Sequence, residues 1–87
     1  SELLEIKMQK AWNDVNKSYR QLQIADRSIE QAKENLRLNQ DYYKAGISKI
    51  SDLLEAQLLY QQACDKRTDA YADYQNKLLE YQQSVGQ

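Results

Sequence analysis

Tyr-Lys-Ala-Gly-Ile-Ser, at residues 43–48, interrupts two long heptad-patterned stretches near the middle of the chain. Gly46 is the only glycine before Gly86. Because glycine enters the left-handed backbone conformation without steric cost, Gly46 can end a first helix and let the chain reverse. Ser48 and Ser51 follow, and their side-chain oxygens can cap the free N–H groups of a second helix. The stretch therefore predicts one helical hairpin with a defined tip.

Before the tip, one line of positions alternates four and three residues apart without a break. Ten of its twelve members are apolar or aromatic, and the other two, Ser18 and Asn39, are small enough to lie in a helix contact. A seam of this kind predicts a helix over about residues 2–44 that packs on a partner along its whole length. The line consists of Leu4, Met8, Ala11, Val15, Ser18, Leu22, Ala25, Ile29, Ala32, Leu36, Asn39 and Tyr43.

After a tip at about residues 45–50, a second helix is predicted over about residues 51–85, with a matching seam. In this seam Arg67 and Lys77 can lay their aliphatic stems along the contact. Further apolar lines flank both seams, which indicates that each helix contacts more than one neighbour. The second seam consists of Leu53, Ala56, Tyr60, Ala63, Arg67, Ala70, Tyr74, Lys77 and Tyr81. The flanking residues are Trp12 and Tyr19 on the first helix and Ile50, Gln57, Cys64, Tyr71, Leu78 and Val85 on the second.

Composition agrees with an all-α chain. The sequence has no proline and only two glycines, and it is rich in residues that favour long helices. The predicted fold is a long antiparallel two-helix coiled-coil hairpin without strands. Since 87 residues in two helices bury little apolar surface, partner helices are expected.

Several function classes are disfavoured by residue content. Twelve basic and thirteen acidic residues are scattered over both halves, so no basic face is expected to bind nucleic acid. Histidine is absent and Cys64 is the only cysteine, so we expect no disulfide, no metal site and no cofactor. No apolar run approaches the roughly 20 residues that span a bilayer. Cys64 and Trp12 are interpreted as packing residues.

Three stretches together resemble the outer-membrane efflux protein family, the TolC-type channels. They are residues 32–38 (Ala-Lys-Glu-Asn-Leu-Arg-Leu), residues 43–48, and residues 51–57 (Ser-Asp-Leu-Leu-Glu-Ala-Gln). The family's hallmark is a Tyr-x-x-Gly turn followed by an Asp-x-Leu-(Asp/Glu)-Ala-(Gln/Thr) helix start. The resemblance continues through residues 59–63 to the Ser-Val-Gly ending at residues 84–86 and so covers nearly the whole chain.

The resemblance implies that this chain is one hairpin of a larger channel protein in the outer membrane of a Gram-negative bacterium, with this segment in the periplasm. Three protomers of such a protein contribute hairpins to an α-helical barrel. The resemblance implies that the turn, here Tyr43, Gly46, Ile47 and Ser48, lies at the periplasmic entrance. There it docks a periplasmic adaptor and, through the adaptor, serves an inner-membrane pump in efflux or type I secretion.

By the same resemblance, Asp52 and Glu55 take the acidic positions that ring the narrow entrance. Two departures from the family pattern concern the gate. Ser48 stands where well-studied members have an arginine that helps to hold the entrance shut, and Glu55 replaces the usual aspartate. An arginine-based closure therefore does not carry over to this chain.

Two interpretations of the acidic residues stay open. Asp52 and Glu55 either form cation-attracting rings in a threefold assembly or merely complement the dipole at the helix start. An exposed tip offers no pocket to separate their pKa values, so no catalysis is expected. Asp65, Asp69 and Asp73 lie along one line of the predicted helix. This line either faces the channel or pairs with basic residues of a neighbouring hairpin, or it is a solvated face balanced by Lys66 and Arg67.

The main alternative function is the coiled-coil hairpin of a periplasmic adaptor protein, or a generic oligomerising spacer. Two kinds of self-association also stay open for the chain. One is the trimer of the full-length channel, and the other is non-native pairing, such as an antiparallel four-helix dimer or a tetramer.

Overall fold

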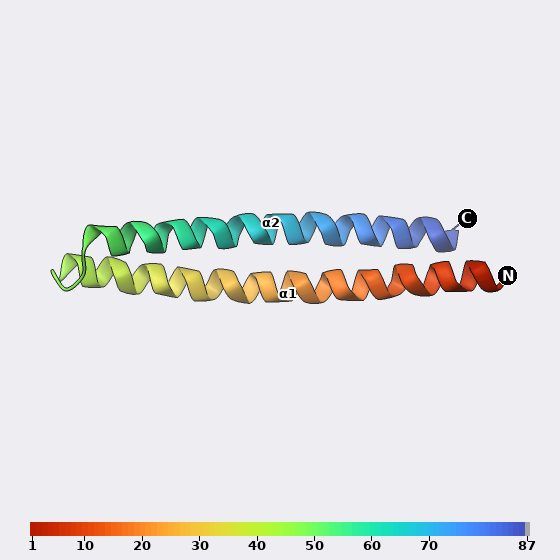
Figure 1. The fold of residues 1–87 in the computed structure, drawn as a ribbon, viewed down its shortest axis with the longest axis horizontal. Helices are drawn as coiled ribbons and strands as arrows, with labels where there is room; N and C mark the ends of the chain where they lie inside the picture. The colour runs from red at the N-terminus through yellow and green to blue at the C-terminus, as the bar shows by residue number, and fades with distance from the viewer. Residues whose placement is uncertain (87) are drawn as a thin grey trace.

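A computed structural model describes residues 1–86 as two long helices joined by a short turn. Helix α1 comprises Glu2–Lys44, 43 residues, and helix α2 comprises Ile50–Gly86, 37 residues. The helices lie side by side and antiparallel, so both ends of the chain lie far from the turn (Figure 1). The molecule measures 67 × 14 × 13 Å, and neither helix is apolar enough along its length to cross a membrane. The predicted hairpin is confirmed, with α2 beginning at residue 50 rather than about 51.

Both predicted seams form the contact between the helices. On α1, each seam position from Met8 to Asn39 is buried or half-buried, whereas Leu4 and Tyr43 at the two ends are 49% and 44% exposed. On α2, all nine seam positions from Leu53 to Tyr81 are buried or half-buried. The coiled-coil packing therefore follows the heptad pattern and frays only at its ends.

Small residues dominate the deepest part of the contact. The side chains exposed by less than a tenth are Val15, Ser18, Leu22, Ala25, Ala56 and Ala63. Ser18 is accommodated because its hydroxyl donates to the Val15 carbonyl at 2.8 Å. Alanines let the two backbones approach closely, but no side chain within residues 1–86 is completely buried. The core is therefore thin, as expected for two helices without a third layer.

One side of the interface carries a ladder of three cross-helix pairs, which we call the aromatic side. Its members are Trp12–Tyr81 (ring centroids 5.2 Å apart), Tyr19–Tyr74 (5.7 Å) and Asp26–Arg67 (2.9 Å between Oδ1 and Nε). Successive pairs are seven residues apart on both helices. The ladder therefore specifies the register of α2 against α1, because a slip of one residue would separate all three pairs.

Arg67 forms its ion pair across the interface and not with the acidic line of its own helix. Its guanidinium pairs with Asp26 on α1 and lies 5.3 Å from the centroid of the Tyr71 ring. An arginine at a seam position reaches across the interface more easily than along its own helix, because the seam points at α1. Among the described residues, the ion pair of Arg67 is therefore with α1 and not with the acidic line of its own helix.

The predicted flanking line on α2 is only partly covered. Cys64 and Leu78 are half-buried, whereas Ile50, Tyr71 and Val85 are 43–50% exposed. On α1, Trp12 and Tyr19 stay about half exposed although their rings contact α2. The hairpin thus leaves a second set of apolar side chains uncovered after its own contact is complete.

Candidate functional site at the hairpin tip

Helix α1 ends in a Schellman motif. Ala45 is the C-cap, with φ −81° and ψ −3°, and Gly46 follows at φ 75°. The Ile47 N–H donates to the Tyr42 carbonyl at 2.8 Å, and the Gly46 N–H donates to the Tyr43 carbonyl at 3.1 Å. These two bonds define the motif and satisfy carbonyls that the helix end leaves free. The prediction that Gly46 ends the first helix is confirmed.

The start of α2 is capped by a carboxylate and not by a serine. The Lys49 N–H donates to Oδ2 of Asp52 at 3.1 Å, and the Asp52 N–H donates back to the Lys49 carbonyl at 3.1 Å. This is the acid-to-N-cap half of a capping box. Because α2 begins at Ile50, Ser51 lies inside the first turn, while the Ser48 hydroxyl is buried without a hydrogen-bond partner among the described residues. The prediction that Ser48 and Ser51 cap this helix is wrong.

The tip presents uncovered apolar side chains. Ile47 is 73% exposed, the largest value among the exposed large apolar residues. Ile50 follows three residues later, and Leu54 and Leu58 continue from Ile50 at intervals of four residues along one side of α2; these three residues are 50–57% exposed. We call these four residues the tip stripe. Leu54 and Leu58 were not predicted as functional residues, although their four-residue spacing from Ile50 outside the seam is a signal that could have identified them.

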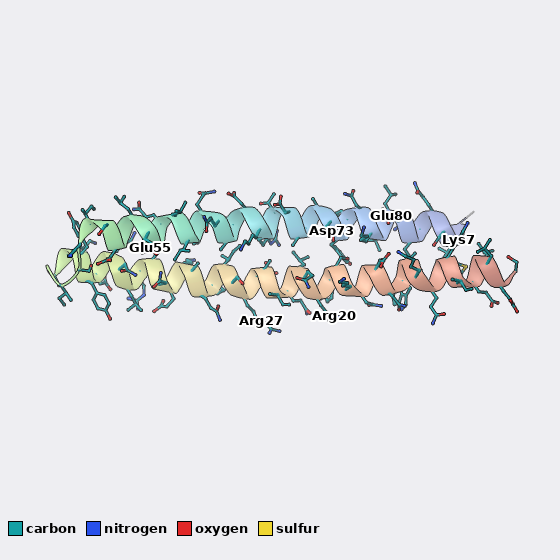
Figure 2. All side chains as sticks on the ribbon, viewed as in Figure 1. Lys7, Arg20, Arg27, Glu55, Asp73 and Glu80 are labelled. Carbon is teal, nitrogen blue, oxygen red and sulfur yellow. The ribbon has the colours of Figure 1, made fainter. Side chains whose placement is uncertain are left out.

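Asp52 and Glu55 lie next to the tip stripe but on another side of α2. Together with Asn35 and Asn39 of α1 they line one shallow hollow between the helices. Figure 2 shows Glu55 on α2 close to the tip. Two exposed carboxylates beside neutral amides make this a site of negative potential. The structure of one chain brings the two acids together, and their arrangement in a ring stays a prediction.

The acidic line of α2 is exposed and only partly paired. Asp65 accepts a hydrogen bond from the Gln61 amide at 3.1 Å, and Asp73 lies 3.9 Å from the Lys77 ammonium. Asp65, Asp69 and Asp73 are all exposed. Within the hairpin the line therefore has local partners but no basic partner on α1 among the ion pairs of residues 1–86.

Charged groups away from the tip form short-range pairs. Lys10 donates to Asp14 at 2.9 Å, and this bond lowers the pKa of the Asp14 carboxyl and raises that of the Lys10 ammonium. Arg37 lies between Glu34 (2.6 Å) and Asp41 (3.1 Å), and its hydrogen bond lowers the pKa of Glu34. All these side chains are in or near solvent, so the pairs favour the charged forms without marking a reactive centre.

Tyr60 and Cys64 are the remaining candidates for unusual chemistry. The pKa of the Tyr60 hydroxyl is raised, chiefly by hydrogen bonding with the Cys64 thiol one turn away. The same hydroxyl is a weaker acid and no better nucleophile as a result. Within residues 1–86, no group of three histidine, cysteine or acidic side chains could hold a metal ion.

No protein-family model, curated protein or solved structure matches this chain.

Because Asp52 caps the start of α2, its replacement should lower the free energy of unfolding. Replacing Asp52 with alanine leaves the Lys49 N–H uncapped and should lower the free energy of unfolding by about 1 kcal/mol. Asp52→Asn keeps an acceptor oxygen and should cost less than half as much. Chemical denaturation followed by circular dichroism measures both. Equal losses for the two variants would show that the charge, and not the hydrogen bond, stabilises the helix start.

Proposed function

We propose that this chain is the periplasmic hairpin of a TolC-like outer-membrane channel for efflux or type I secretion. In this role it forms part of the tunnel wall and of the entrance gate, and its tip docks a periplasmic adaptor. The observation that carries the proposal is the tip stripe. A turn that only connected two helices would not need four large apolar side chains exposed beside it.

The shape of the tip supports docking. The Schellman motif holds the turn without any help from a partner, so Ile47 is presented in one defined position at the end of a 67 Å rod. A preorganised apolar side chain loses little conformational entropy on binding. An adaptor helix could then bury Ile47 together with the stripe that continues along α2.

The uncovered sides of both helices support lateral packing in a wall of hairpins. Arg20 and Arg27 project from the outer side of α1, away from α2 (Figure 2). The exposed acidic line Asp65, Asp69 and Asp73 lies on α2. A neighbouring hairpin could set one group against the other and cover the flanking apolar residues at the same time. A gate built this way works mechanically and electrostatically, by sliding of hairpins past one another.

The docking part of the proposal is tested in the full-length parent protein. Ile47→Asp places a charge at the centre of the proposed contact and should weaken adaptor binding by about 2 kcal/mol, roughly 30-fold, and lower export accordingly. Leu79→Asp is the matched control, since Leu79 is a 53% exposed large apolar residue on α2, far from the tip. Adaptor affinity that falls equally, or not at all, for the two variants would contradict docking at the tip and leave a spacer.

A further inference from the structure

The two sides of the hairpin differ, and the side opposite the aromatic side has a groove. Three adjoining hollows follow one another between α1 and α2 from Gln21 toward the tip. The first two share Ser28 and Lys66, and the last two share Asn35 and Leu59. They therefore form one continuous groove of about 27 Å along the helices. We call this surface the groove face.

Side chains on the groove face follow a pattern that is complementary to itself. On α2, Asp52, Leu59 and Lys66 are seven residues apart and thus lie on one line of the helix. The line reads acidic, apolar, basic, with opposite charges at equal distances from Leu59. On α1, Ser28 and Tyr42 lie seven residues on either side of Asn35. This second line reads small, polar, large about its own centre.

A twofold axis requires this kind of pattern. In an isologous contact each residue meets the partner's residue at the same distance beyond the axis. From the groove face we propose that two copies of this chain pair antiparallel, groove face to groove face, about an axis near Leu59 and Asn35. In this pairing Asp52 of each copy lies opposite Lys66 of the other copy, which gives two such contacts in each dimer. The pairing also sets the small Ser28 against the large Tyr42, and the exposed Leu59 against its own counterpart.

Charges of the neighbouring positions select this register. About Leu59, the opposite charges of Asp52 and Lys66 face each other, because both residues lie seven positions from the axis on the same line of α2. A shift of the axis by one heptad to Lys66 would set that lysine against itself and Asp52 against Glu80. Like charges opposite each other are unfavourable, so the register about Leu59 is preferred.

The area is sufficient for a specific dimer. The overlap on α2 reaches from the tip to about residue 72, about 40 Å of helix at about 1.5 Å per residue. Over the 14 Å width of the hairpin each copy buries about 560 Å², and the pair about 1,100 Å², slightly more than the roughly 1,000 Å² expected of a specific interface. The result is a four-helix arrangement around the tip halves, which supplies the layer that the thin core lacks.

This pairing is a property of the free chain and does not rest on the proposed channel function. Because it covers Asp52, a hairpin held in a tunnel wall with Asp52 at an aqueous entrance is not paired in this way. Failure of the dimer would therefore leave the channel proposal unaffected, and failure of docking at Ile47 would leave the dimer unaffected.

Cysteine cross-linking tests the axis directly. In a Cys64→Ser background, Leu59→Cys places the same thiol of both copies next to the axis, where a disulfide can form. We expect mild oxidation to convert this variant into a covalent dimer at least about 10-fold faster than the matched control Leu58→Cys, at equal protein concentration. Leu58 is 57% exposed against 44% for Leu59, so random collisions favour the control. Equal or faster cross-linking of the control would overturn the proposal.

Sedimentation equilibrium of the 87-residue chain supplies an independent readout. We expect a monomer–dimer equilibrium, with the dissociation constant raised about 10-fold by Lys66→Glu, which reverses two contacts in each dimer. Lys33→Glu makes the same charge change in the same half of the hairpin, beside Tyr60 in a different hollow, and should have little effect. A chain that is monomeric at about 100 µM, far above the micromolar range of weak specific pairs, or equal effects of both variants, would contradict the dimer.

Discussion

Replacing Leu22 with alanine is expected to lower the free energy of unfolding by about 2 to 3 kcal/mol, the largest effect of any single truncation in the chain. Leu22 is 8% exposed at the centre of the seam and is the largest side chain in the deepest part of the contact. Because the core consists mostly of alanines, little surrounding volume can collapse into the cavity. Urea denaturation followed by far-ultraviolet circular dichroism measures the change.

Leu54→Ala is the matched control for this prediction. Leu54 is 55% exposed on the tip stripe, and the same truncation there should cost no more than about 0.5 kcal/mol. Both variants must be compared at one protein concentration, since self-association adds to the apparent stability. Similar losses at residues 22 and 54 would mean that the seam is not the main stabilising contact.

Replacing Gly46 with valine should lower the free energy of unfolding by about 2 kcal/mol and, under the proposed function, lower export by the channel protein. Gly46 has φ 75°, which a β-branched residue adopts only with strain. A Cβ at this position would meet nothing within 4 Å, so the expected loss comes from backbone strain and not from a clash of the Cβ. Valine would therefore distort the Schellman turn and displace Ile47.

Gly46→Asn separates the backbone effect from the loss of glycine itself. Asparagine tolerates the left-handed conformation better than other residues with a side chain, so it should cost less than about 1 kcal/mol and preserve most export. Thermal unfolding and an export assay measure the two effects. Unchanged stability, unchanged hairpin geometry and unchanged export in the valine variant would refute a structural role for the turn.

The heptad pattern was enough to predict the hairpin. The alternation of three and four residues identified both helices, their approximate ends and nearly every residue of the contact. It succeeded because the period of the apolar residues matches the helix and because Gly46 is the one residue in the middle of the chain that permits a left-handed turn. Ser18 also lies in the contact as predicted, because its hydroxyl bonds to its own helix.

The predictions that were wrong depend on the exact position of residues and not on the apolar pattern. Ser48 and Ser51 were predicted to cap the second helix, but Asp52 does so, because a helix start one residue earlier changes which side chain reaches the free N–H. The pair between Asp26 and Arg67 could not be predicted, because a heptad seam by itself does not say which residues of two antiparallel helices are opposite each other. The structure supplies that register through the aromatic side.

The candidate site was predicted in part. Gly46 is confirmed as the helix-ending residue, and Ile47 proves to be the most exposed large apolar residue. Leu54 and Leu58 were not predicted as part of the site because they lie outside both seams. Single apolar residues outside a seam are common on solvent-exposed helix faces and do not by themselves indicate a binding surface. The groove face was missed for a similar reason: its pattern about Leu59 is meaningful only once a second copy is considered.

Ion conductance of the full-length parent in a planar bilayer tests the central claim most directly. If Asp52 and Glu55 ring the entrance of a channel, the double variant Asp52→Asn and Glu55→Gln should clearly lose the cation preference of the unmodified protein, because neutral rings no longer attract cations. A parent that forms no channel, or a double variant with unchanged ion selectivity, would contradict the account and reduce this chain to a structural hairpin.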